Sequence, residues 1–114
     1  LGAHAQNREL LGEYRIGIVG RDQGDAIDQA TQLGTQDAAR ELSEQYSIDV
    51  ELLDFTPNLE QGGSQPASLA GLFIEDADGF IISPAEPEVI RSSIEFALEQ
   101  GQQVVFFENQ IDDI

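Results

Sequence analysis

A short run of apolar residues in the second half of the chain is bounded by glycine and proline, in the sequence Asp78-Gly79-Phe80-Ile81-Ile82-Ser83-Pro84. Aromatic and β-branched residues favour a strand, and a run without apolar–polar alternation is typical of a strand covered on both faces, as in a parallel sheet. Similar runs occur at Ile16-Gly17-Ile18-Val19-Gly20, Val50-Glu51-Leu52-Leu53-Asp54-Phe55 and Val104-Val105-Phe106-Phe107. The Val50–Phe55 run alternates more than the others, which indicates an edge strand.

Helical patterns separate these four strands. Between residues 25 and 46, steps of three or four predict a helix with one apolar stripe, formed by Ile27, Ala30, Leu33, Ala38, Leu42 and Tyr46. Shorter patterns predict helices over residues 64–76 and 87–100. Ser64 is the expected N-cap of the first, Pro87 opens the second, and Gly101 suits its end.

The order of elements predicts the fold class. Successive strands start 34, 30 and 24 residues apart, which is the spacing of βαβ units. Because such crossovers are right-handed, alternating strands and helices predict an α/β fold with a doubly wound parallel sheet. The expected architecture is a flavodoxin-like three-layer sandwich with strand order 2-1-3-4.

Polar side chains follow three of the predicted strands. In doubly wound sheets, ligands bind beyond the carboxyl ends of the strands, where the winding reverses. For this strand order the crevice lies between the loops at residues 21–25, 83–87 and 108–112, and the loop at 56–58 is expected to lie further off. The candidate ligand-binding residues are Arg21, Asp22, Gln23, Asp25, Ser83, Glu108 and Asn109.

The charge of the chain excludes some partners. The 114 residues include 22 acids and five arginines, so the formal net charge is −17, and cysteine is absent. Like-charge repulsion argues against a nucleic acid or an anionic membrane as partner. No run of apolar residues is long enough to span a bilayer. A lysine-free acidic surface is also compatible with salt adaptation, which we hold as a hypothesis.

Several enzyme classes lack the residues that they need. The first-strand loop has two acids and neither the glycine spacing nor the lysine of a phosphate-binding loop. A phosphoacceptor domain needs an aspartate where this chain has Ser83, and also a lysine. A hydrolase triad needs a histidine or an equivalent base, and the one histidine, His4, lies in the N-terminal segment. Asp22, Asp25 and Glu108 would suit Mg²⁺ or Ca²⁺, but chance proximity explains them better among so many acids. We therefore expect no enzyme activity, cofactor or metal.

Four segments carry a resemblance to a known family. They are Tyr14–Val19, Leu33–Leu42 with its early glycine, Asp78–Pro84, and Gln100–Asn109, which follows a helix ending in glycine. Together they resemble the N-terminal lobe of type I periplasmic binding proteins, the ribose-binding-like group. The same lobe serves as the effector domain of lactose-repressor-type regulators. The resemblance covers residues 14–110, so we expect a leader or linker at 1–13 and this lobe at 14–114.

The resemblance implies reversible binding of a small polar ligand, such as a sugar, for an ABC-type transport or sensing system, in the periplasm or outside the cell. The alternative is the effector domain of a cytoplasmic regulator. A third hypothesis is a flavodoxin-like interaction module, or an enzyme fragment without its site. The family's aromatic pair after an Asn-Pro is replaced here by Gln23-Gly24-Asp25-Ala26-Ile27, and its Asp-Arg by Glu108-Asn109. Without the aromatic pair, stacking of a sugar ring on an aromatic side chain is not expected. The acids Asp22, Asp25 and Glu108 make an amine-bearing ligand a further hypothesis.

The length of the chain sets an expectation about partners. The family has two lobes, and the second lobe, which would close over the ligand, is absent from these residues. The fourth strand would then present an unpaired edge. We expect either the remainder of a longer chain or a second copy pairing at that edge.

Overall fold

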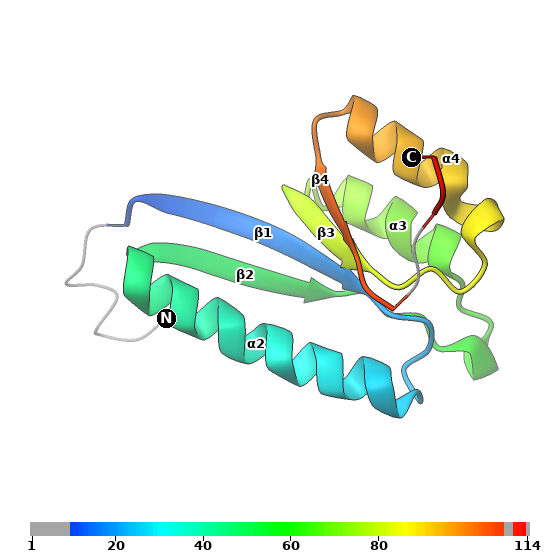
Figure 1. Ribbon diagram of the computed structural model, residues 1–114, viewed down its shortest axis with the longest axis horizontal. Coiled ribbons are helices and arrows are strands. Elements are labelled where there is room, and N and C mark those ends of the chain that lie inside the picture. Colours follow the sequence, from blue (N-terminus) through cyan, green and yellow to red (C-terminus); the bar gives the residue numbers. More distant parts are fainter. Residues whose placement is uncertain (1–9, 109–110, 114) are drawn as a thin grey trace.

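The structure, a computed structural model, describes residues 10–108 and 111–113. Its middle layer is a parallel sheet with the strand order β2-β1-β3-β4 (Figure 1). The strands are β1 (Gly12–Val19), β2 (Ile48–Asp54), β3 (Gly79–Ile82) and β4 (Gln103–Phe106). The doubly wound α/β fold and the strand order predicted from the sequence are confirmed, and the alternating strand β2 lies at an edge.

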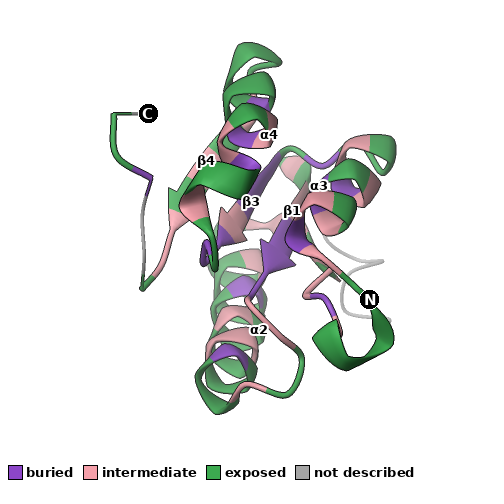
Figure 2. Cartoon of the chain, turned by 90° about the vertical axis from the view of Figure 1, so that its right-hand side faces the viewer, coloured by how far each residue is buried: buried purple, intermediate pink, exposed green. Residues whose placement is uncertain are grey.

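Helices cover the two faces of the sheet unequally. Helices α3 (Gln65–Ile74) and α4 (Pro87–Glu99) lie side by side on one face, and α2 (Ala26–Tyr46) lies on the other. A 3₁₀ turn, η1 (Leu59–Gln61), follows β2. Seen along the turned view of Figure 2, α2 is well separated from α3 and α4, with the sheet between them. No helix in the described part of the chain combines the length and the apolar character that a membrane crossing needs.

Local sequence signals set the helix ends. The Asp25 carboxylate accepts hydrogen bonds from the backbone N–H groups of Ile27 and Asp28, at 2.9 and 3.0 Å, and so caps α2. Ser64 caps α3 in the same way. Gly101 follows α4 with a φ of 83°, a left-handed conformation that favours glycine. The predicted ends of these helices are therefore correct to within about two residues.

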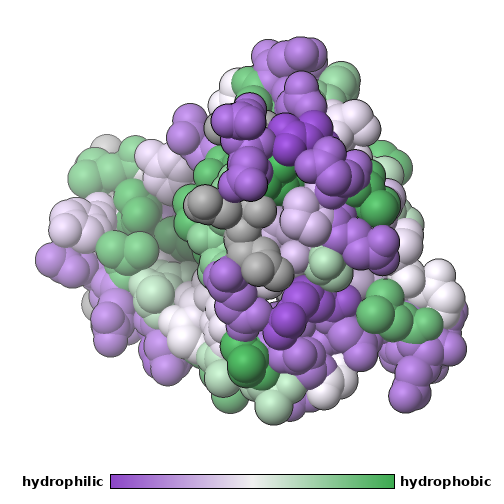
Figure 3. All heavy atoms as spheres, turned by 45° about the vertical axis from the view of Figure 1, so that its right-hand side comes forward, coloured by the Kyte–Doolittle hydropathy of each residue, from purple (hydrophilic) through white to green (hydrophobic). Residues whose placement is uncertain are grey.

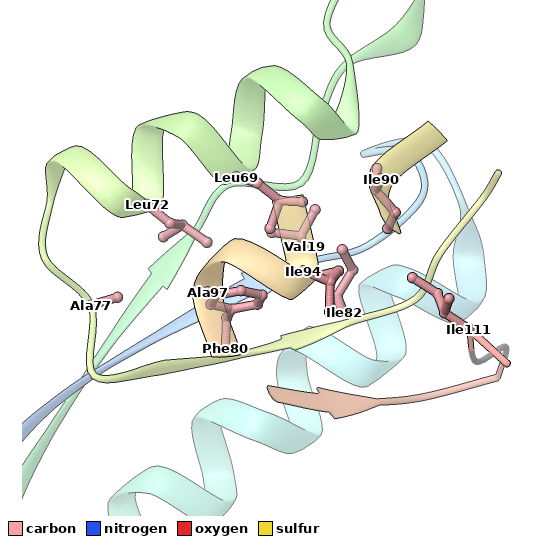
Figure 4. Close-up of a cluster of buried hydrophobic side chains, with 10 residues drawn as sticks. All are labelled: Val19, Leu69, Leu72, Ala77, Phe80, Ile82, Ile90, Ile94, Ala97 and Ile111. Atoms are coloured by element: carbon pink, nitrogen blue, oxygen red, sulfur yellow. The ribbon is translucent and has the colours of Figure 1, made fainter. Parts of the chain in front are cut away.

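The hydrophobic core lies between the sheet and the α3–α4 layer. Its central ring is Phe80, 1% exposed, which meets Phe73 edge-to-face at a centroid distance of 6.2 Å. Every helical member comes from α3 or α4 and none from α2 (Figure 4). The members are Val19, Leu69, Leu72, Ala77, Phe80, Ile82, Ile90, Ile94, Ala97 and Ile111.

Two glycines permit close approach within this core. A Cβ atom on Gly17 would lie 2.5 Å from a methyl carbon of Leu72, so a side chain there would push α3 off the sheet. A Cβ atom on Gly79 would lie 2.7 Å from the carbonyl oxygen of Gln103 on the neighbouring strand. That contact is with backbone, which cannot turn away as a side chain can. The glycine before the Phe80 run is thus needed for β3 and β4 to pair.

The apolar stripe that the sequence predicts on α2 is largely exposed. Ile27, Leu33, Leu42 and Tyr46 are 43–62% exposed, whereas the buried residues of α2 are Asp28 and Ala39. The helix therefore rests on the sheet through a face that is largely polar. Among the described elements, α2 makes its main contacts with the edge strand β2.

The first strand begins earlier than the segment that carries the family resemblance. β1 begins at Gly12 rather than at Tyr14, because Gly12 and Glu13 pair with Ile48 and Asp49 of β2. Residues 1–9, with His4, lie outside the described residues.

Candidate functional site

An arginine joins the ends of the first and fourth strands. Arg21 follows β1, and its Nη2 atom lies 2.9 Å from Glu108 Oε2 and 3.2 Å from Asp25 Oδ2. All three side chains are partly buried, at 25–31% exposure. Glu108 has a φ of 63°, which is strained for a residue with a side chain. The structure therefore brings together three of the residues that the sequence analysis assigned to the crevice.

A buried glutamine fixes the floor of this crevice. Gln65 opens α3 and is only 5% exposed. Its Nε2 atom donates to the carbonyl oxygens of Gly20, at 2.9 Å, and of Ser83, at 2.8 Å, and its Oε1 atom accepts from Ala85 N at 3.0 Å. One side chain thus ties together the ends of β1 and β3. The sequence analysis missed it, although Gln65 shares the buried helix face with Leu69 and Leu72.

A buried aspartate holds the loop after β1. Asp28 is 6% exposed, and its Oδ2 atom accepts from the N–H groups of Arg21, at 2.8 Å, and Asp22, at 3.1 Å. A Cβ atom on Gly20 would come within 2.8 Å of the Asp28 carboxyl carbon. Hydrogen bonds from its backbone N–H groups to Asp28 therefore hold the loop that carries Arg21. The sequence analysis missed Asp28, although an acid in the first turn of a helix was a signal that could have led to it.

The loop after β2 is closer than predicted. Gln23 donates to Thr56 O at 3.0 Å, the Asp22 carboxylate accepts from Leu59 N at 3.1 Å, and Gly20 N donates to Thr56 Oγ1 at 2.9 Å. The expectation that residues 56–58 lie further off is wrong, because β2 pairs directly with β1 and both strands end at the same edge. Asp22 and Gln23 therefore belong to the β1–β2 side of the crevice.

Three buried polar atoms near the strand ends have no hydrogen-bond partner among the described residues. They are the Ser83 hydroxyl, in a residue that is 0% exposed, Arg21 Nε and the second carboxylate oxygen of Asp28, Oδ1. Buried polar groups are normally satisfied, so these unpaired atoms are exceptions at the strand ends. Asn109, the remaining candidate, lies outside the described residues.

Two hollows flank the β1 loop. The one on the β3 side, about 180 Å³, is mostly apolar and is lined by Arg21, Leu59, Ser64, Gln65, Pro66, Ala85, Glu86, Val89 and Ile90. The one on the β2 side, about 260 Å³, is polar and is lined by Asp22, Gln23, Asp28, Gln29, Gln32, Asp54 and Thr56. Within the described ranges no three acids or histidines are placed to hold a metal ion. Arg21, which pairs with Asp25 and Glu108, is one of the residues that line the apolar hollow.

An ion pair at the start of α4 gives a pH-dependent observable. A side-chain hydrogen bond from Arg91 to Glu88, at 3.0 Å, lowers the pKa of Glu88 below its ordinary value of 4.5. Arg91 also donates to Asp112 O at 2.9 Å, which anchors the segment after β4.

We expect Glu88 to titrate below the ordinary pKa of a glutamate. Because its pKa is depressed in the folded state, the stabilisation is present above the unfolded pKa and is lost as the pH falls through the folded value. Carboxyl ¹³C NMR titration measures this. The Arg91→Gln variant should return the Glu88 pKa to the ordinary range, and an unchanged pKa would contradict the pairing.

Comparison with known proteins bears on the fold. No family model matches the sequence, and no curated protein matches it. Among solved structures, the chain is similar to an ABC transporter solute-binding protein from Mycobacterium smegmatis with bound glycerol, at a TM-score of 0.60 and 18% identity. The match covers 90% of this chain and 33% of that protein, so the chain spans about a third of the length of the protein that it matches. At this identity the likeness shows a shared fold.

Proposed function

We propose that the crevice at the ends of β1, β3 and β4 binds a small hydroxyl-rich solute, and that the chain is a ligand-binding lobe of an ABC-type transport or sensing protein. The observation that carries this proposal is the position of Arg21. It lies between Asp25 and Glu108, at the strand ends where the winding of the sheet reverses, beside an apolar hollow. The solved protein of similar fold holds glycerol, which is a small polyol.

The chemistry of the crevice suits a hydroxyl-rich ligand. Arginine donates and carboxylates accept, so adjacent hydroxyls can bond to both, while apolar residues such as Leu59 and Val89 contact the carbon skeleton. An amine-bearing ligand is less well supported, because Asp25 and Glu108 already pair with Arg21. The proposed ligand is therefore a sugar or polyol, bound without a cofactor and without chemical change.

The rest of the proposal concerns the setting of the protein. A solute-binding lobe of this kind would act in the periplasm or outside the cell. It would close over its ligand with a second lobe, through a hinge motion. Binding to the lobe alone is then expected to be weak, so the assay must detect weak binding, as NMR titration does.

The Arg21→Gln variant tests this function. Glycerol, ribose, glucose and an uncharged polar control such as urea are titrated into ¹⁵N-labelled protein, and amide and Arg21 Nε–H shifts are followed by NMR. We expect one or more polyols to shift residues 20–25 and 83–86. Because hydrogen bonds to a charged group contribute about 1.5–3 kcal/mol, Arg21→Gln should weaken binding roughly 10- to 100-fold.

Arg40→Gln is the matched control, since Arg40 pairs with Asp37 on the exposed part of α2. It should leave the binding unchanged. If no polyol shifts the crevice residues, or if both variants weaken binding equally, the proposed function is wrong.

A further inference from the structure

Two features that would normally attract an anion lie at the crevice. Arg21 carries a positive charge, and α3 and α4 both begin there, since residues of their first turns line the same apolar hollow as Arg21. Backbone N–H groups at the start of a helix often bind phosphate or carboxylate groups. Whether the ligand is charged or neutral therefore depends on how far this charge and these donors are already used within the chain.

The carboxylates of the protein already neutralise Arg21. Its Nη2 atom lies 2.9 Å from Glu108 Oε2 and 3.2 Å from Asp25 Oδ2. One arginine between two acids leaves an excess of negative charge, and a further acid, Glu86, lines the hollow. An anionic ligand beside Arg21 would therefore meet more negative than positive charge.

Prolines and acids occupy the starts of the two helices. Pro66 and Pro87 lie in the first turns of α3 and α4, and proline has no N–H group to donate. Glu86 is the N-cap residue of α4, and Glu88 lies in its first turn. An acid at the start of a helix already makes the favourable interaction with the helix dipole that a bound anion would otherwise gain.

Two backbone donors beside the hollow also bond within the chain. The N–H group of Ala67, in the first turn of α3, donates to Ser64 Oγ at 3.3 Å. The N–H group of Ala85, which lines the hollow, donates to Gln65 Oε1 at 3.0 Å. A ligand anion would have to displace Ser64 or Gln65 to reach these groups.

Uncharged hydroxyl groups suit these surroundings better than anions do. A hydroxyl can donate to a carboxylate of the protein, whereas a ligand carboxylate can only accept. Figure 3 shows that hydrophilic residues predominate, with hydrophobic ones between them, on the side of the molecule toward which the strands point. The net charge of −17 adds a general repulsion of anions over the whole surface.

We propose that the crevice selects uncharged sugars and polyols and excludes their acidic derivatives, such as uronates and sugar phosphates. Asp25, Glu86 and Glu108 determine this selectivity, because they place negative charge around Arg21 and the start of α4. The inference rests on the proposed function and adds to it the charge of the ligand.

Pairs of ligands that differ in one group test the selectivity. The pairs are glycerol and glycerate, ribose and ribose 5-phosphate, and glucose and glucuronate, each titrated into ¹⁵N-labelled protein and followed by NMR. At about 0.15 M NaCl, charges more than about 8 Å apart are largely screened, so the general repulsion is weak. Because a ligand charge would lie a few ångströms from partly buried carboxylates, we expect the acidic member of a pair to bind roughly tenfold more weakly or worse.

Variants that remove one negative charge locate the source of the selectivity. Glu108→Gln and Glu86→Gln should each lower the ratio of the acidic to the neutral dissociation constant roughly threefold or more, because each removes a charge and keeps the size of the side chain. Glu41→Gln is the matched control. It changes the net charge equally, but Glu41 is exposed on α2, about 24 Å along the helix from Asp25, so it should leave the ratio unchanged. Circular dichroism checks that each variant is folded.

Two results would overturn this inference and leave the proposed function in place. The first is an acidic ligand that binds as tightly as its neutral counterpart. The second is an equal change of the ratio in Glu41→Gln and Glu108→Gln, which would mean that the net charge of the chain sets it. If none of the neutral ligands shifts the crevice residues, the proposed function fails and this inference fails with it, so the two failures are distinguishable.

Discussion

Phe80→Ala is expected to lower the free energy of unfolding by about 4 kcal/mol, because it removes a fully buried aromatic ring and leaves a cavity. Phe80 is 1% exposed and lies in the hydrophobic core between the sheet and the α3–α4 layer (Figure 4). Collapse around the cavity is limited because α3 already approaches the sheet closely at Gly17. Urea denaturation followed by circular dichroism measures the change.

Phe96→Ala provides the matched control for Phe80. Phe96 is 48% exposed on α4, and its ring meets Phe73 at a centroid distance of 5.3 Å. Loss of this partly exposed aromatic pair should cost about 1 kcal/mol. Equal losses for Phe80→Ala and Phe96→Ala would mean that the core is not where the structure places it.

Gln65→Leu is expected to lower the free energy of unfolding by at least about 3 kcal/mol, although leucine is apolar and of similar size. The change leaves the carbonyl oxygens of Gly20 and Ser83 and the N–H group of Ala85 without the bonds that Gln65 makes. Each buried polar group that loses its partner costs about 1–3 kcal/mol. The same urea denaturation measures this loss.

The Gln65 variant also affects the crevice. Because Gln65 ties the loop before Arg21 to the loop after β3, NMR shifts of residues 20–22 and 83–85 should change even where the variant remains folded. Gln36→Leu, on the exposed face of α2, should alter neither stability by more than about 0.5 kcal/mol nor those shifts. A variant at Gln65 that matched Gln36→Leu in both measurements would contradict the proposed role.

The sheet and the helix ends were predictable from local patterns. The runs around Ile18 and Phe80 lack alternation because β1 and β3 are central strands of the parallel sheet. The run around Val105 was expected to be covered on both faces as well, but β4 lies at an edge of the sheet and Val105 is 57% exposed. Helix caps are also local. Asp25 and Ser64 accept hydrogen bonds from N–H groups two or three residues ahead, and Gly101 adopts the left-handed conformation that ends α4. These interactions involve neighbours in sequence, so the sequence alone contains them.

The candidate site was predictable only in part. The rule that ligand sites lie beyond the ends of parallel strands led to Arg21, Asp25 and Glu108, which the structure brings together. It did not lead to Gln65 or Asp28. Gln65 looks like ordinary helix surface until its backbone partners, at the ends of β1 and β3, are known. Asp28 bonds to the loop just before its own helix, where its place in the first turn was the only signal.

The sequence by itself determined the order of strands and helices, the winding of the sheet and the loops that share one edge, because these follow from periodicity and chirality. Only the tertiary structure decided that the apolar stripe of α2, with Ile27 and Leu42, is largely exposed and that the loop at residues 56–58 lies against Gln23. Periodicity states which residues share one face of a helix. Whether that face meets the sheet or solvent depends on where the helix sits across the strands, which is set by contacts between distant parts of the chain.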